Sequence, residues 1–198
     1  MKIIIVGAIG TIGKKVTEAL QGDHEIITAG SKSGDLQVDI TSPESIEAFY
    51  KQTGNFDALV STTGSGHFGP LKSTTPADFK KGIDSKLLGQ INLVLIGQHY
   101  INPKGSFTLT SGILSEDPVV NGVNLSTLNG GLNSFVIGAA IELENDVRIN
   151  AVSPGVVEDS PGYFPYFPGH IPVTMDKVVV AYIRSVLGAG TGQVIKVY

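Results

Sequence analysis

The stretch KIIIVGAIGTIG, residues 2–13, decides the fold. Residues 2–6 form a short, β-branched apolar run that predicts a buried strand, and an amphipathic helical pattern starts at Thr11. Between them lie Gly7, Gly10 and Gly13. Glycine at these positions permits a sharp turn out of the strand, close approach of the backbone to a pyrophosphate, and tight packing of the helix on the sheet. Any tight strand-to-helix turn can use such glycines, but their place after the first strand favours a dinucleotide site.

The rest of the chain continues this alternation of strands and helices. Further strands are expected at residues 24–29, 36–40, 57–62, 106–111, 147–153 and 193–197, and helices at 11–21, 43–52, 76–100, 122–142 and 176–187. Strands that are apolar nearly throughout are typical of parallel sheets covered on both faces, and strict strand-helix succession implies right-handed crossovers. Since no linker or repeat is visible, residues 1–198 are predicted to form a single domain. Its expected fold is Rossmann-type α/β, doubly wound, with a mostly parallel sheet of about seven strands and helices on both faces.

Composition and charge exclude several other classes of protein. The 198 residues have a formal net charge of −4 and are 41% hydrophobic, which suffices for one sizeable core and offers nothing to attract nucleic acid. The absence of cysteine excludes disulfide scaffolds and thiolate metal sites and favours a reducing, cytoplasmic location. The histidines lack ligand spacing, so no metal site is expected. Glycines and lysines interrupt the apolar start, and no run is long enough to span a membrane, so we expect neither export nor a membrane partner.

The end of the second predicted strand bears on which dinucleotide is bound. An acidic side chain there pairs with the ribose 2′-hydroxyl of NAD and repels the 2′-phosphate of NADP. The chain instead has Ser31, Lys32 and Ser33, which offer hydroxyl donors and a positive charge, while Asp35 lies beyond a glycine turn. We therefore expect NADP(H), with NAD less favoured. An ordinary polar surface loop is the alternative.

The order of the motifs resembles that of the short-chain dehydrogenase/reductase family over essentially the whole chain. The resemblance rests on the glycine turn, on Val38-Asp39-Ile40, on the strands that end at Thr63-Gly64 and Ser111-Gly112, on RINAVSPG at residues 148–155 and on TGQV at residues 191–194. It implies these cofactor contacts: Gly7, Gly10, Ile12 and Gly13 at the pyrophosphate with Thr11 in the same turn, Asp39 and Ile40 near the adenine, Thr63 and Gly64 beside the adenine-side ribose, and Pro154 and Gly155 near the nicotinamide. Glycine and proline at strand ends also serve turns, so each position alone has a purely structural explanation.

The catalytic residues that the resemblance implies are mostly replaced. Members of the family protonate the product through a tyrosine whose pKa a nearby lysine lowers, while a serine polarises the substrate carbonyl. Ser111 matches the serine, but Asn124 and Leu128 stand where Tyr-x-x-x-Lys is expected, and Lys86 replaces the motif asparagine of the preceding helix. Because an amide and an alkyl side chain do not titrate near neutral pH, the chain predicts a non-standard proton donor.

Other side chains are candidates for the missing donor or cation. Lys86 can extend toward the space left by the missing lysine, although a solvated helix lysine is commoner. Tyr163 and Tyr166 lie in an aromatic and proline-rich segment that can also simply enclose an apolar ligand. His67 lies in a glycine-rich loop, and imidazole is a common proton carrier, but such histidines are usually just exposed. Our predicted catalytic residues are Ser111, Lys86 and Tyr163.

Two long helices have more apolar surface than one core needs. The stripes at residues 79, 83, 87, 91 and 95 and at 128, 132 and 136 predict core-facing sides, and Leu88, Val94 and Phe135 lie beside them. A second copy of the chain would cover these residues, giving a homodimer or homotetramer through the two helices. Gly130 and Gly131 inside the second helix are unfavourable by about 1 kcal/mol each relative to alanine. Close approach of another backbone or a ligand would explain them, and a kinked or frayed helix is the alternative.

Two functions fit these features. The first is NADP(H)-dependent reduction of a small carbonyl or an activated double bond, in which Ser111 polarises the substrate and Lys86 or a loop tyrosine assists. The second is a catalytically silent protein that binds NADP(H) and reports its occupancy to a partner. Only the first needs a path for a proton. We favour it, because hydride transfer survives loss of the phenol when the product is a stabilised anion.

Overall fold

Seven strands are interspersed with helices along the chain, β3 following β2 without a helix between them, and all of residues 1–198 are described by the computed structural model. The strands are β1 (Lys2–Val6), β2 (Glu25–Gly30), β3 (Leu36–Gln37), β4 (Phe56–Ser61), β5 (Ile101–Thr110), β6 (Arg148–Pro154) and β7 (Val194–Val197). The α-helices are α1 (Thr11–Leu20), α2 (Pro43–Thr53), α3 (Pro76–Gly82), α4 (Gly89–Gly97), α5 (Val123–Ala139) and α6 (Met175–Leu187). Short 3₁₀ turns form η1 (Leu71–Ser73), η3 (Ile113–Ser115) and η4 (Pro161–Tyr166), and η2 (Ile83–Leu88) is π-helical.

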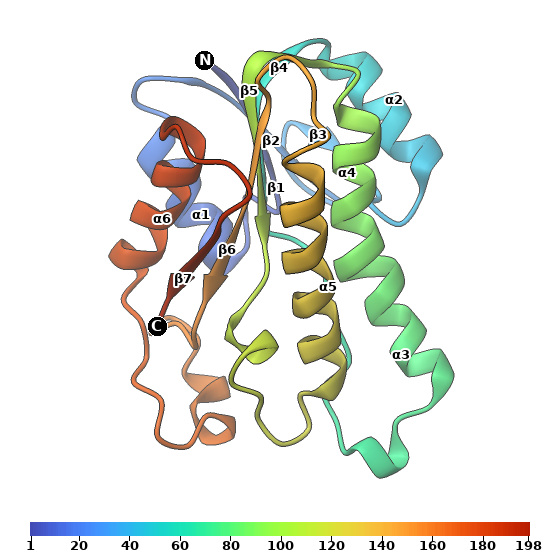
Figure 1. The fold of residues 1–198 in the computed structure, drawn as a ribbon, viewed down its shortest axis with the longest axis vertical. Helices are drawn as coiled ribbons and strands as arrows, with labels where there is room; N and C mark the ends of the chain where they lie inside the picture. The colour runs from blue at the N-terminus through green and yellow to red at the C-terminus, as the bar shows by residue number, and fades with distance from the viewer.

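The strands form one parallel sheet in the order β3-β2-β1-β4-β5-β6-β7. Helices α1 and α6 cover one face, and α2, α4 and α5 cover the other (Figure 1). The predicted doubly wound, single-domain α/β fold is confirmed, with a sheet that is parallel throughout. None of the helices combines the length and the apolar character needed to cross a membrane.

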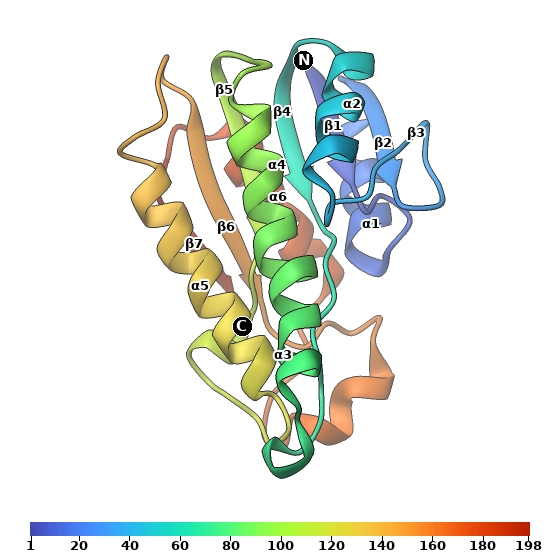
Figure 2. The same cartoon turned by 90° about the vertical axis from the view of Figure 1, so that its right-hand side faces the viewer.

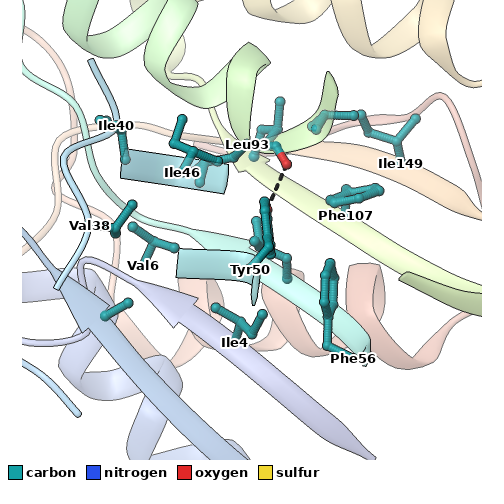
Figure 3. Packing of buried hydrophobic residues seen from close by; sticks show 14 of the residues in the cluster. Ile4, Val6, Val38, Ile40, Ile46, Tyr50, Phe56, Leu93, Phe107 and Ile149 are labelled. Carbon is teal, nitrogen blue, oxygen red and sulfur yellow. Dashed lines mark hydrogen bonds between the residues drawn. The ribbon is translucent and has the colours of Figure 1, made fainter. Parts of the chain in front are cut away.

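Both faces of the sheet are buried, which explains why β1 and β4 are largely apolar. In β1, Ile3 and Ile5 pack beneath α1 and α6, whereas Ile4 faces α2, α4 and α5. Between the sheet and helices α2, α4 and α5, the largest side chains lie around Tyr50. Its hydroxyl donates a 2.7 Å hydrogen bond to the carbonyl oxygen of Leu93 (Figure 3). The phenol is thereby satisfied inside an apolar cluster.

A π-helical turn joins α3 and α4 into one continuous rod that lies beside α5 (Figure 2). Such a turn adds one residue to the α-helical spacing, so positions beyond it rotate by about 100° around the axis. Ile91 still packs against the core, but the predicted apolar stripe is wrong at its last position, Leu95. Leu95 is 48% exposed, while Leu93 and Val94 are buried in the core. Val94 is thus not available to a second copy of the chain, contrary to our expectation.

Two other local predictions differ from the structure. The strand expected at 36–40 ends at Gln37, because Asp39 turns the chain by accepting hydrogen bonds from the backbone N–H and hydroxyl of Thr41. Helix α5 runs unbroken through Gly130 and Gly131, so the alternative of a kinked helix is wrong. A Cβ on Gly131 would lie 3.0 Å from Leu87, whereas one on Gly130 would meet nothing within 4 Å.

The carboxyl ends of the parallel strands all lie at the same end of the sheet, the lower end in Figure 1. The loops after β4, β5 and β6 gather there. Open α/β sheets bind their ligands beyond the carboxyl ends of the strands, where the strand order reverses. Here that reversal falls between β1 and β4.

Candidate functional site

The turn after β1 brings α1 very close to the sheet. Gly7 has φ +88°, a conformation that side chains rarely adopt. A Cβ on Gly13 would overlap the carbonyl oxygen of Gly7 and lie 2.6 Å from Oγ1 of Thr62. That Thr62 hydroxyl donates to the carbonyl oxygens of Val6 and Gly7, at 3.2 and 3.1 Å. The glycines are thus required by the geometry of the turn, which holds α1 directly over the end of β1.

Helix α1 begins at the turn without a side-chain cap and without an acidic residue in its first turn. Helices α2 and α3 are capped by Ser42 and Thr75, whose hydroxyls accept hydrogen bonds from backbone N–H groups, whereas α5 and α6 also lack a side-chain cap. The first N–H groups of any helix lack intrahelical partners, and the helix dipole favours an anion there. Those of α1 are left to a ligand, so the turn fits a pyrophosphate.

A groove of about 610 Å³ opens beside this turn, at the ends of β1, β2 and β4. Nine of the residues that the resemblance or the sequence predicted line it: Gly7, Gly10, Ser31, Lys32, Ser33, Asp39, Ile40, Thr63 and Gly64. Thr11, Ile12 and Gly13 lie next to its wall in the first turn of α1. Pro154 and Gly155 lie outside it, at the end of β6.

The groove also contains residues that sequence reasoning missed. Ile9, Thr41, Thr62, Ser65 and Ser85 line it as well. Ser85 belongs to the π-helical segment and accepts a 3.1 Å hydrogen bond from the backbone N–H of Ser65. No sequence signal places Ser85 there, because a π-helical turn decides which way it faces. Thr62 and Ser65 flank the predicted residues Thr63 and Gly64, so the same motif could have predicted them.

The acidic residue nearest to the end of β2 points away from the groove. Thr28 donates to the Asp35 carboxylate through its N–H at 2.9 Å and its hydroxyl at 2.8 Å. These hydrogen bonds, the backbone one first, lower the pKa of Asp35. The Asp35 carboxylate is therefore ionised, and its hydrogen bonds come from Thr28 of β2. Ser31, Lys32 and Ser33 form this rim of the groove. Asp39 does line the groove, and hydrogen bonds from the hydroxyl and N–H of Thr41 lower its pKa.

Two side chains of the α3–α4 rod fill the gap where β4 and β5 separate. The last paired residues are Val60 and Thr108. Beyond them, Gln90 accepts a hydrogen bond from the N–H of Thr110 at 2.9 Å and donates one to its carbonyl oxygen at 3.0 Å. Lys86 Nζ donates to the carbonyl oxygens of Thr110 and Ser111, both at 3.3 Å. Gln90 thus replaces the missing strand partner, and Lys86 places a cation at the end of β5.

Lys86 is 9% exposed and takes part in no ion pair. Burial disfavours the charged form and lowers its pKa from 10.5 to about 8. The alternative of a solvated surface lysine is therefore wrong. At neutral pH the side chain is an ammonium group in an interior where its only partners are carbonyl dipoles.

Ser111 lies next to this ammonium group, directly after β5, and is 4% exposed. Its hydroxyl donates to the carbonyl oxygen of Asn129 at 3.2 Å, and its N–H donates to Val152 at 2.9 Å. The structure therefore brings together Ser111 and Lys86, two of the three predicted catalytic residues, although they are 25 positions apart in the chain.

The two positions where the family resemblance predicts tyrosine and lysine are packed into the interior. Asn124 and Leu128 are both fully buried. Asn124 accepts a hydrogen bond from the N–H of His67 at 2.8 Å and donates one to the carbonyl oxygen of Phe79 at 3.2 Å. Asn124 therefore connects the loop after β4 to α3, and His67 contributes its backbone to this connection.

The third predicted catalytic residue, Tyr163, stands apart from the other two. It lies in η4 and is 57% exposed. Tyr166 of the same turn packs edge to face on Phe68, with ring centroids 5.0 Å apart. The segment after β6 thereby closes against the loop after β4, and Tyr163 remains at its outer surface.

Comparison with known proteins identifies the family. Residues 9–163 match a family model described as Enoyl-(Acyl carrier protein) reductase. The crystal structure of the protein lin1944 from Listeria innocua is 50% identical, with a TM-score of 0.98 and 100% of both chains covered. A small-chain dehydrogenase in complex with NADPH is 25% identical, with a TM-score of 0.89, covering 100% of this chain and 96% of the other.

More distant structures share the fold alone. A short chain dehydrogenase from Mycobacterium smegmatis is 19% identical, with a TM-score of 0.83, covering 100% of this chain and 91% of the other. None of the curated proteins matches the sequence. The family match and the shared parallel sheet agree with the motifs at both ends of the chain, and the protein therefore belongs to the short-chain dehydrogenase/reductase family.

Proposed function

We propose that the protein is an NADP(H)-dependent oxidoreductase that reduces a small carbonyl compound or an activated double bond. The observation that supports this most is the uncapped start of α1 beside a groove rimmed by Ser31, Lys32 and Ser33. A 25% identical small-chain dehydrogenase was solved in complex with NADPH. The cofactor, when bound, supplies a hydride from its nicotinamide ring.

The residues that would hold the cofactor follow from the groove and the family motifs. Backbone groups of the glycine turn would bind the pyrophosphate, and the Lys32 ammonium with the two flanking hydroxyls would bind a 2′-phosphate. The full set is Gly7, Gly10, Thr11, Ile12, Gly13, Ser31, Lys32, Ser33, Asp39, Ile40, Thr63, Gly64, Pro154 and Gly155. NAD lacks the 2′-phosphate and is expected to bind less tightly.

The reaction itself is assigned to the end of β5. The Ser111 hydroxyl would polarise the substrate carbonyl, and the buried Lys86 ammonium would stabilise the negative charge that develops on its oxygen. Inside the protein such a charge acts more strongly than it does in water. Tyr163 is exposed on the outer surface of η4 and would contact the substrate only after this segment turns it inward.

An oligomer through the two long helices also belongs to this proposal. Leu88 and Leu95 are 41% and 48% exposed, Ile137 of α5 is 57% exposed, and the backbone is uncovered at Gly130. A second copy packed on this face would bury these side chains, with the close backbone approach that glycine permits. The cysteine-free composition fits a reducing, cytoplasmic setting.

A catalytically silent NADP(H)-binding protein is the second candidate. The packing of Asn124 and Leu128 into the interior favours it, because these positions have lost any contact with a substrate. The experiment that separates the two follows NADPH consumption with a panel of carbonyls, quinones and enones. For the enzyme, Ser111→Ala and Lys86→Ala should each lower turnover by about 100-fold. NADPH binding without turnover of any compound would favour the silent protein instead.

A further inference from the structure

A row of polar groups, here called the polar seam, runs between η3 and α5. It consists of Ser111, Gly112, Ser115, Asn129 and Asn133. Asn133 Nδ2 donates a 3.0 Å hydrogen bond to the Ser115 hydroxyl, which donates a 3.0 Å bond to the carbonyl oxygen of Gly112. At the other end, the Ser111 hydroxyl donates to the carbonyl oxygen of Asn129. Ser111 and Ser115 are four positions apart, and so are Asn129 and Asn133. One turn of α5 therefore contacts Ser111, and the next turn contacts Ser115.

Two amide oxygens in this seam lack hydrogen-bond donors. Asn129 is 3% exposed and Asn133 is partly buried, and Oδ1 of each is buried without a partner. A buried polar atom without a partner is unfavourable, so nearly all such atoms in folded proteins are paired with protein groups or ordered water. Two unpaired acceptors one helical turn apart therefore indicate that a molecule able to donate hydrogen bonds occupies the seam.

Turning the amides over still leaves a buried group unpaired at each position. In a flipped Asn133, Oδ1 would accept a hydrogen bond from the Ser115 hydroxyl while Gly112 keeps the Ser115 N–H, and Nδ2 would become the unpaired group; water can pair with either an acceptor or a donor. In a flipped Asn129, an unpaired N–H donor would replace the unpaired oxygen. A Cβ at position 112 would lie 2.9 Å from Asn129 Nδ2, so the loop after β5 packs closely against this amide.

We propose that the polar seam binds water, and that this water returns a proton to Ser111 after each turnover. The water site stands on the unpaired amides alone, whereas the proton transfer rests on the proposed function. Reduction of a carbonyl adds a hydride to carbon and a proton to oxygen. The Ser111 O–H bond breaks as the O–H bond of the product forms, and a seam water then donates a proton to Ser111 Oγ. Solvent reprotonates that water through the Ser115 end, which is partly exposed.

This arrangement gives Asn129 and Asn133 a positioning role. Each would hold a water through Oδ1, and neither touches the reacting atoms. The seam would thereby replace the path that a tyrosine at position 124 would otherwise provide. Leucine at either asparagine keeps the branching at Cγ but has no acceptor, so Asn129→Leu and Asn133→Leu would remove the water. Asn55→Leu is a matched control, because Asn55 is exposed at the opposite end of β4.

The water site is tested by a crystal structure of the intact protein at a resolution that shows ordered water. The expected result is water within hydrogen-bond distance of Asn129 Oδ1 and of Asn133 Oδ1, and its loss in Asn129→Leu. A dry seam, in which protein donors have moved onto both oxygens, would overturn the proposal whatever the activity of the protein.

The proton transfer is tested by turnover in H₂O and D₂O with the panel compound that the parent reduces fastest. Asn129→Leu should lower kcat by about tenfold or more and enlarge the solvent isotope effect, with an unchanged Kd for NADPH. Asn55→Leu should match the parent. An unchanged kcat and isotope effect in Asn129→Leu would overturn this half of the proposal. A parent protein without any turnover would also overturn the proton transfer, and with it the proposed function. The crystal structure would still test the water site in that case.

Discussion

The ammonium nitrogen of Lys86 lies 3.3 Å from the carbonyl oxygen of Ser111. A cation from the α3–α4 rod thus faces the backbone of the serine that matches the family's catalytic serine. The family resemblance predicts a lysine at position 128 of α5, where this chain has leucine. The π-helical turn η2 decides which way Lys86 points, so this turn is what brings a cation to Ser111.

The buried charge of Lys86 should make stability depend on pH. The pKa of Lys86 is about 8 in the folded protein against an ordinary value of 10.5, so the unfolded chain binds the extra proton between these values. Stability relative to Lys86→Met should therefore rise from pH 8 to pH 10.5, by about 3 kcal/mol at most. Urea unfolding at a series of pH values measures this, with Lys72→Met at an exposed lysine as the control. A difference between parent and Lys86→Met that does not vary with pH would contradict the burial of a charged lysine.

Lys32 should distinguish the two dinucleotides. Removing its charge in Lys32→Ala should weaken NADPH binding by about tenfold, which corresponds to about 1.4 kcal/mol, and should leave NADH binding nearly unchanged. Fluorescence titration with each cofactor measures both constants, and Lys72→Ala serves as the control. Equal losses for the two cofactors would show that Lys32 does not recognise the 2′-phosphate.

The exposed side of the two long helices should mediate self-association. Leu95→Glu would place a charge on this apolar face, and sedimentation should show a shift from oligomer to monomer at micromolar concentration. Leu71→Glu changes an exposed leucine in η1 and should leave the oligomer intact. A parent protein that sediments as a monomer would refute the interface itself.

Restoring the family motif should damage this protein rather than improve it. Asn124 is fully buried with two hydrogen bonds, and a Cβ on Gly82 would already overlap Asn124 Oδ1. The double variant Asn124→Tyr, Leu128→Lys should therefore lose about 3 kcal/mol or more of stability, through overpacking and lost hydrogen bonds. Thermal unfolding followed by circular dichroism tests this. A stable variant with raised NADPH consumption would mean that the site still accommodates the usual tyrosine.

The fold was predictable because burial on both faces of the sheet leaves a clear pattern. Apolar strands such as residues 2–6, separated by amphipathic helices, permit few other architectures. The π-helical turn was not predictable, since its residues have no distinctive composition and the shift in helix phase depends on tertiary packing. The prediction for residues 79–95 was therefore wrong at the end of the stripe, where Val94 is buried and Leu95 is exposed, whereas Ile91 packs against the core as predicted.

The parts of the candidate site that lie close together in the sequence were predictable, and the contacts between distant segments were not. The glycine turn and the rim at Ser31–Ser33 are local in sequence, and the structure places both at one groove. Contacts across the fold left no local signal. Gln90 of α4 forms hydrogen bonds with the backbone of Thr110 in β5. Ser85 lines the groove only because the π-helical turn η2 orients it that way.

Isothermal titration calorimetry with NADPH and NADH tests the central claim most directly, because every proposal about the reaction requires that the start of α1 bind an adenine dinucleotide. We predict saturable, one-to-one binding of NADPH with a micromolar or lower Kd, weaker binding of NADH, and a higher melting temperature with NADPH present. Absence of binding heat and of thermal stabilisation with both cofactors at saturating concentrations would contradict the account.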